Sequence, residues 1–128
     1  MTVRHNILVV EDEIIEAMFL RKILELWGYD VCELTTAGEN AVQEARLGNP
    51  DLVLMDITIN GRMSGLEAAG KIRTQLGIPI IFITGYSDEE TRRQAEAVSP
   101  AGYFVKPIDY DTLKARIASV LRQDNPKK

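Results

Sequence analysis

The length, composition and charge of the chain already exclude several classes of protein. It has 128 residues, 45% of them apolar and 27% charged, which fits one soluble globular domain. A net charge of −4 without a basic stripe argues against direct binding of nucleic acid. No apolar stretch could span a bilayer, and the first apolar run is too short for a signal peptide. With a single cysteine, Cys32, and hence no internal disulfide, we expect a cytoplasmic protein.

Strand-like and helix-like segments alternate along the whole chain. Short apolar runs predict strands near 6–10, 30–34, 52–56, 80–84 and 102–105. Helical spacing of apolar residues predicts helices near 14–27, 38–47, 65–76, 88–98 and 110–122. The continuous apolar runs are typical of parallel strands covered on both faces, whereas the charge of Glu33 marks the second strand as an edge strand. The alternation predicts right-handed βαβ crossovers in a single domain, with a core at about 6–122 and a polar tail at 123–128.

Apolar stripes indicate which faces the first and last helices bury. Ile15, Phe19 and Ile23 form a stripe on the first helix, which we expect to face the core. Gly28 follows this helix, where a glycine commonly ends one. The last helix carries its own stripe, made of Leu113, Ile117, Val120 and Leu121.

Polar residues predict where three of the helices begin. Ser64-x-x-Glu67 and Ser87-x-x-Glu90 are both capping-box patterns, in which the first and fourth residues satisfy each other's backbone N–H groups. Asp109 is a plausible N-cap for the last helix. We therefore expect the third and fourth helices to start just after Ser64 and Ser87.

Four of the predicted strands end at polar residues of different chemical kinds. Glu11 and Asp12 follow the first strand, Asp56 ends the third, Thr84 ends the fourth and Lys106 follows the last. In a parallel sheet of order 2-1-3-4-5, these strand ends share one edge and the first and third strands are neighbours. Three carboxylates, a hydroxyl and an ammonium would then meet there. This set suits a hard divalent cation such as Mg²⁺ together with a phosphoryl group.

Four of these five residues also have an ordinary structural explanation when each is taken alone. Glu11 and Asp12 could be solvated loop acids, Thr84 a residue at the start of a helix, and Lys106 a solvated lysine. Asp56 differs, because it ends a run that should be buried, and a buried carboxylate can serve as a nucleophile. A Lys-Pro pair after a buried strand suggests a fixed turn, with a cis peptide bond as one option, that aims the lysine. The occurrence of all five polar residues at strand ends therefore favours a binding site for a divalent cation and a phosphoryl group.

The chain resembles the receiver domains of two-component response regulators, the CheY-like superfamily, over about residues 6–122. The motifs that carry this resemblance are Val10-Glu11-Asp12-Glu13, Asp56, Thr84 and Gly102-Tyr103-Phe104-Val105-Lys106-Pro107. The resemblance implies a doubly wound (βα)5, flavodoxin-like three-layer α/β sandwich with a five-stranded parallel sheet of order 2-1-3-4-5. It also implies a phosphoacceptor signalling switch in a two-component phosphorelay.

The same resemblance implies a role for each acidic residue. Asp56 would accept a phosphoryl group from the histidine of a sensor kinase or of a phosphotransfer protein. Asp12 and Asp56 would bind Mg²⁺ directly, together with the main-chain carbonyl of Thr58. Glu11, where aspartate is commoner in the family, would act through a bound water.

The resemblance also implies that the lysine binds the phosphoryl group and that the hydroxyl residues change position when it is present. Lys106 would hold a phosphoryl oxygen, and Thr84 would hydrogen-bond the phosphoryl group and move toward it. Tyr103 would report that movement on a surface that passes the signal to a downstream protein. This surface would comprise the elements near 88–98, 102–105 and 110–122. We expect no contact with nucleic acid or membrane, and a monomer or weak homodimer.

Two segments depart from the common receiver pattern. The loop after Asp56 is one residue longer than in most receivers, and Asn60-Gly61 offers a tight turn in place of the usual proline. Phe82-Ile83-Thr84-Gly85-Tyr86 resembles a receiver subgroup with a Phe-x-Thr-Gly-Tyr segment. In such a segment Tyr86 could share or replace the role of Tyr103.

Three other functions remain open at this point. A phosphatase or phosphotransferase resembling haloacid dehalogenases would use Asp56 in turnover, but Thr58 stands where such enzymes have a second acid. A flavodoxin-like cofactor domain would need a phosphate-binding loop where this chain has Glu11-Asp12-Glu13. A receiver that no longer accepts phosphate is disfavoured by the intact site residues. We expect a switch that phosphorylates and dephosphorylates only itself, not an enzyme acting on an external substrate.

Overall fold

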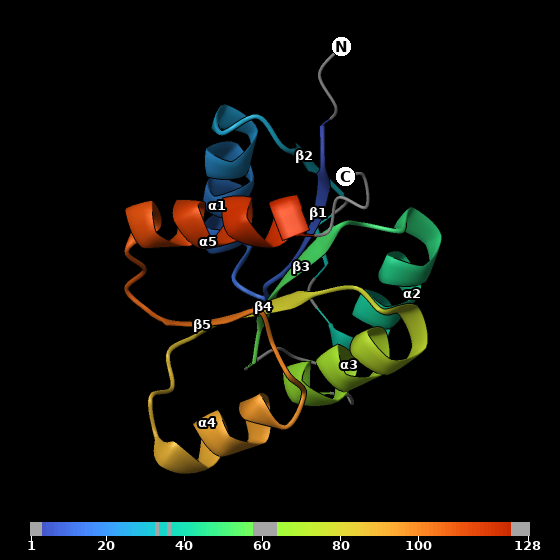
Figure 1. Cartoon of the computed structure of the whole chain (residues 1–128), viewed down its shortest axis with the longest axis vertical. Helices are drawn as coiled ribbons and strands as arrows, with labels where there is room; N and C mark the ends of the chain where they lie inside the picture. Colours follow the sequence, from blue (N-terminus) through green and yellow to red (C-terminus); the bar gives the residue numbers. More distant parts are fainter. Residues whose placement is uncertain (1–3, 33, 36, 58–63, 124–128) are drawn as a thin grey trace.

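The computed structural model describes residues 4–32, 34–35, 37–57 and 64–123. Within them, five parallel strands in the order β2-β1-β3-β4-β5 alternate with helices (Figure 1). The strands are β1 (Asn6–Val10), β2 (Asp30–Val31), β3 (Leu52–Asp56), β4 (Ile80–Thr84) and β5 (Gly102–Val105). The helices are α1 (Ile14–Leu26), α2 (Gly38–Gly48), α3 (Gly65–Lys71), η1 (Ile72–Leu76), α4 (Glu89–Glu96) and α5 (Tyr110–Gln123). The predicted doubly wound α/β fold and its strand order are confirmed.

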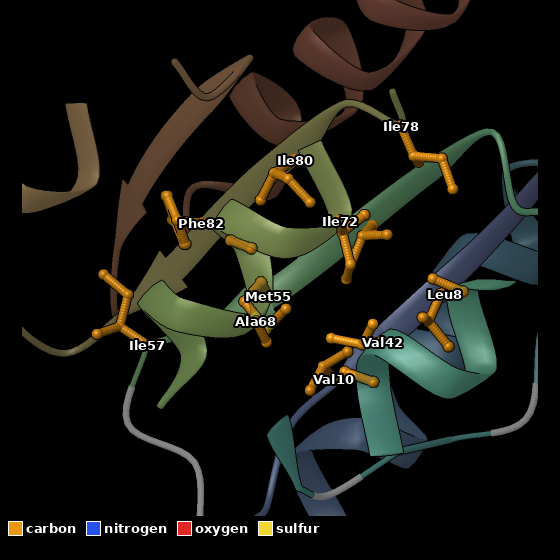
Figure 2. Packing of buried hydrophobic residues seen from close by; sticks show 14 of the residues in the cluster. Leu8, Val10, Val42, Met55, Ile57, Ala68, Ile72, Ile78, Ile80 and Phe82 are labelled. Atoms are coloured by element: carbon orange, nitrogen blue, oxygen red, sulfur yellow. The ribbon is translucent and has the colours of Figure 1, made fainter. Parts of the chain in front are cut away.

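The sheet lies between two layers of helices. Helices α1 and α5 lie on one face, whereas α2, α3 and α4 lie on the other (Figure 1). Side chains of the central strands alternate between these faces, as the two-residue period of a strand requires. Leu8, Val10, Val53, Met55, Ile80 and Phe82 point to the α2–α3 side, part of which Figure 2 shows. Ile7, Val9, Leu52, Leu54, Ile81 and Ile83 point to the α1–α5 side.

Most of the predicted element boundaries agree with the structure to within two residues, and two elements differ by more. The second strand is shorter than predicted, Asp30–Val31, although Thr35 still forms an isolated parallel bridge with Val10. The predicted helix 65–76 is α-helical only as far as Lys71 and then continues as a π-helical turn, η1, which ends at Gly77 with φ 70°. Among the described helices, none has the length and apolarity that crossing a membrane requires.

The predicted buried face of α1 is wrong. Ile15 is 74% exposed and Phe19 is 54% exposed, whereas Ala17, Leu20 and Leu24 are buried against the sheet. Apolar residues occur on both stripes of this helix, so the pattern could not decide between them. The small Ala17 side chain, which is fully buried, faces the sheet. By contrast, the predicted stripe of α5 is confirmed, with Leu113, Ile117, Val120 and Leu121 all buried.

One of the two predicted capping boxes is confirmed and the other is wrong. At the start of α3, Ser64 accepts a hydrogen bond from the Glu67 backbone, and the Glu67 side chain accepts one from Ser64 N–H. At the start of α4 the N-cap is Asp88, not Ser87, and its carboxylate accepts the backbone N–H of Thr91 at 3.0 Å. An aspartate one residue further along offers the stronger acceptor for this helix start. Asp109 caps α5 as predicted, accepting two backbone N–H groups.

Candidate functional site

The fold brings the predicted polar residues to one edge of the sheet. Val10 pairs in register with Met55, so Glu11 and Asp12 leave β1 beside Asp56, the last residue of β3. On the other side of β3, Asp56 pairs with Ile83, the residue before Thr84. The parallel register, not local sequence, therefore determines this meeting of strand ends.

Glu11, Asp12 and Asp56 form an acidic cluster at the centre of this edge. Each can offer one carboxylate oxygen such that these atoms all lie within 4.8 Å of one another. Glu11 is 2% exposed and Asp56 is 4% exposed, whereas Asp12 is half-buried. Carboxylates packed this closely repel one another unless positive charge lies between them. An all-oxygen donor set of this charge fits a hard divalent cation such as Mg²⁺.

Lys106 supplies the positive charge that reaches this cluster. Its Nζ donates hydrogen bonds to Glu16 at 2.8 Å, Glu11 at 3.0 Å and Asp56 at 3.3 Å. The Lys106–Pro107 peptide bond is cis, the option that the sequence left open. The backbone N–H of Lys106 also donates to the carbonyl of Thr84 at 2.7 Å, which joins the ends of β4 and β5.

Burial and mutual charge shift the pKa values of this group. Burial of the Glu11 carboxyl, reinforced by the nearby charge of Asp56, raises its pKa from 4.5 to about 7 despite hydrogen bonds from Glu13 and Lys106. Burial opposes the charged form of Lys106, but hydrogen bonds to Glu16 and Glu11 and the charge of Asp56 outweigh it and raise the Lys106 pKa. Positive charge is therefore firmly held here, while negative charge on Glu11 is disfavoured.

The raised pKa of Glu11 predicts how stability depends on pH. Between about pH 4.5 and pH 7 the folded protein binds more protons than the unfolded chain, so Glu11 makes stability fall as pH rises. We expect Glu11→Gln to match wild type most closely at about pH 4 and to be more stable by on the order of 2–3 kcal/mol at about pH 8, without added metal. Urea unfolding of both proteins measures this difference. If the difference in the free energy of unfolding between the two proteins stays constant with pH, or changes in the opposite direction, the raised pKa of Glu11 is not its cause.

Thr84 connects the acidic edge to two tyrosines. Its side chain is fully buried, and its Oγ accepts the backbone N–H of Tyr86 at 3.1 Å. The carbonyl of Tyr86 in turn accepts the hydroxyl of Tyr103 at 2.9 Å. Tyr103 is half-buried on β5, and the guanidinium of Arg92 from α4 lies 4.8 Å from its ring centroid. Both predicted switch tyrosines are therefore connected to Thr84, and a Cβ added at Gly85, between Thr84 and Tyr86, would have no neighbour within 4 Å.

Gly65 positions the backbone of the phosphoacceptor candidate, Asp56. Its N–H donates to the carbonyl of Ile57 at 3.2 Å. A Cβ added at Gly65 would overlap the carbonyl oxygen of Asp56 and lie 2.8 Å from Cα of Ile57. The start of α3 therefore packs directly on the end of β3. The predicted Thr58 ligand and the Asn60-Gly61 turn lie outside the described residues.

Two features of this edge were missed by sequence reasoning. Glu16, in the first turn of α1, is the nearest carboxylate partner of Lys106. Glu16 and Lys106 also help to line a cavity of about 590 Å³, together with Ile15, Phe19 and Tyr110. The available signal was an acidic residue four positions after Asp12, on the helix that leaves the site.

Comparison with known proteins gives consistent matches. Residues 7–118 match the family described as "Response regulator receiver domain". The transcriptional regulatory protein ZraR of Escherichia coli K12 is 34% identical over 117 residues, which cover 91% of this chain and 26% of that protein. The chain thus spans about a quarter of the length of this relative.

Solved structures agree with these sequence matches. The signal receiver domain of a modulated diguanylate cyclase from Desulfovibrio desulfuricans G20 is 37% identical, with a TM-score of 0.90 over 98% of this chain and 100% of that one. The BeF3-activated N-terminal receiver domain of Klebsiella pneumoniae RstA is 26% identical, with a TM-score of 0.85 over 92% of this chain and 99% of that one.

Proposed function

The chain belongs to the response regulator receiver family of two-component signalling, and from this premise we propose that it is a switch phosphorylated on Asp56. One observation carries the proposal. Asp56 is a buried carboxylate at a strand end, with Lys106 Nζ 3.3 Å from its Oδ2 and the carboxylates of Glu11 and Asp12 beside it. The nucleophilic carboxylate of Asp56, the ammonium of Lys106 and two further carboxylates therefore meet at one place.

In the proposed reaction, Asp56 takes a phosphoryl group from a phosphohistidine of a sensor kinase or phosphotransfer protein. A carboxylate oxygen of Asp56 attacks phosphorus, the P–O bond forms as the P–N bond breaks, and the histidine nitrogen takes a proton from solvent. Lys106 is placed to hold a phosphoryl oxygen, because its ammonium already contacts Asp56. The lysine thus stabilises charge that the transfer brings to this edge.

Glu11, Asp12 and Asp56 would hold Mg²⁺ in this proposal, with Glu11 contributing through water and the carbonyl of Thr58 as a further ligand. When bound, the cation would neutralise carboxylate charge and polarise a phosphoryl oxygen. The close spacing of the three acids and the raised pKa of Glu11 support this proposal, because a bound cation would relieve the repulsion among the carboxylates.

The connection from Thr84 to Tyr103 supports the proposed switch. If the Thr84 side chain moves toward a phosphoryl oxygen to donate its O–H, its Oγ would shift relative to the N–H of Tyr86, a residue whose carbonyl accepts the Tyr103 hydroxyl. The resulting shift would reach α4, β5 and α5, where we place the contact with a downstream protein. In this proposal the protein turns over no external substrate, and only its own aspartyl phosphate forms and hydrolyses.

Acetyl phosphate provides a direct test of the proposed function. We expect the protein to gain one phosphoryl group when it is incubated with acetyl phosphate and Mg²⁺, as followed by intact-mass spectrometry. Excess EDTA should abolish the gain, because the acidic cluster then keeps its repulsive charge. No mass gain in Mg²⁺ would contradict the proposal. Steady release of phosphate from many small phosphoesters would instead favour the phosphatase alternative.

A further inference from the structure

Glu16 is a third carboxylate that engages the site lysine. It lies in the first turn of α1, outside the acidic cluster formed by Glu11, Asp12 and Asp56. Its Oε1 is 2.8 Å from Lys106 Nζ, which is shorter than the distance from the same nitrogen to Asp56, 3.3 Å. The ammonium is thus held more closely by the helix than by the phosphoacceptor.

The three N–H donors of Lys106 are all in use, so a phosphoryl group must compete with the carboxylates for them. A lysine ammonium has three N–H donors. Glu16, Glu11 and Asp56 accept three hydrogen bonds from it. A phosphoryl oxygen that needs one of these donors must therefore displace or weaken an existing bond.

Exposure indicates which bond is lost most easily. Glu16 is 52% exposed, compared with 2% for Glu11 and 4% for Asp56. Water can replace the ammonium at an exposed carboxylate, whereas a buried carboxylate that loses its partner suffers the full cost of burial. Release of Glu16 is therefore the lowest-cost route by which Lys106 can turn to a phosphoryl group.

We propose that Glu16 is a positioning residue that holds Lys106 toward α1 and competes with the phosphoryl group for its ammonium. The inference rests on the proposed function, since it concerns phosphorylation of Asp56. Glu16 thereby restrains phosphorylation, and its exposed carboxylate is released to solvent when the phosphoryl group arrives. Phosphorylation of Asp56 would then change the contacts of α1, through Glu16, as well as those of the surface around Tyr103.

Neutralising Glu16 tests this inference. We expect Glu16→Gln to raise the rate of phosphorylation by acetyl phosphate, at saturating Mg²⁺, by about two- to five-fold, and to tighten beryllofluoride binding by a similar factor. The effect should shrink as salt rises. Glu25→Gln is the matched control, because Glu25 lies on the same helix but pairs with Arg21. A rate unchanged in Glu16→Gln, or raised equally in Glu25→Gln, would overturn the inference.

Two further variants separate the contact from simple charge. Glu16→Asp keeps the charge on an arm shorter by one bond, about 1.5 Å, and should lose the contact and behave like Glu16→Gln. Glu16→Gln should have no effect in a Lys106→Met background, because it acts through the ammonium. If Glu16→Asp matches wild type while Glu16→Gln is faster, or if the gain persists without Lys106, competition for the ammonium is wrong. A wild-type protein that takes no phosphoryl group contradicts the proposed function itself, and this inference falls with it.

Discussion

Asp56→Asn should take up no phosphoryl group from acetyl phosphate under conditions in which the wild-type protein is fully modified. The amide lacks the nucleophilic carboxylate oxygen, so the covalent route is lost and not merely slowed. The change is nearly isosteric, and Asp56 lies beside Glu11 and Asp12, so removing its charge also relieves repulsion. The variant should therefore remain folded, with a melting temperature at or above that of wild type.

Intact-mass spectrometry and thermal unfolding together check this prediction. The control is Asp111→Asn, which removes an exposed acid in the first turn of α5 and should leave phosphorylation unchanged. A phosphoryl group that still appears on Asp56→Asn would show that a neighbouring carboxylate, such as that of Asp12, is the true acceptor. An unfolded variant would show that Asp56 contributes to stability in a way that the acidic cluster does not predict.

Gly65→Ala should be the most damaging small substitution near the site. The added methyl group would overlap the carbonyl oxygen of Asp56 and lie 2.8 Å and 2.9 Å from Cα and the carbonyl oxygen of Ile57. These are backbone atoms, which cannot rotate away as a flexible side chain can. We expect a loss of about 3 kcal/mol in the free energy of unfolding, together with slower phosphorylation because the end of β3 must shift.

Gly70→Ala is the matched control for that substitution. Gly70 lies in the same helix, α3, and a methyl group there meets nothing within 4 Å. Alanine should stabilise this helix position by about 0.5–1 kcal/mol, because it restricts the unfolded chain and favours the helix. Urea unfolding of the two variants makes the comparison. Equal stability of Gly65→Ala and Gly70→Ala would contradict the close packing of α3 on β3.

The strand ends could be predicted from the sequence because local pattern and topology agree there. Apolar runs identify buried parallel strands, and the order of those strands then requires Glu11, Asp56 and Thr84 to meet. The face of α1 could not be predicted in the same way. Ile15 and Leu20 lie on competing apolar stripes, and only packing of the helix against the sheet selects the second.

The N-cap residue of α4 and the partner of Lys106 could not be predicted from the pattern of residues along the sequence. Ser87 and Asp88 are adjacent residues that can both cap a helix, and the structure uses Asp88. Glu16 and Lys106 lie 90 residues apart, so their ion pair depends on how α1 and the end of β5 are placed. Sequence reasoning therefore found the acidic cluster and its lysine but missed the helix residue that shares that lysine.

The central claim is that Asp56 is the residue that carries the phosphoryl group, and chemical trapping tests it most directly. Borohydride reduces an aspartyl phosphate to homoserine, which peptide mapping by mass spectrometry locates in the chain. After treatment with acetyl phosphate and Mg²⁺, we predict homoserine at position 56 and at no other acidic residue. Homoserine at Asp12 or another aspartate, the corresponding alcohol of glutamate (5-hydroxynorvaline) at Glu11, or no reduced residue in protein that has gained a phosphoryl group, would contradict the account.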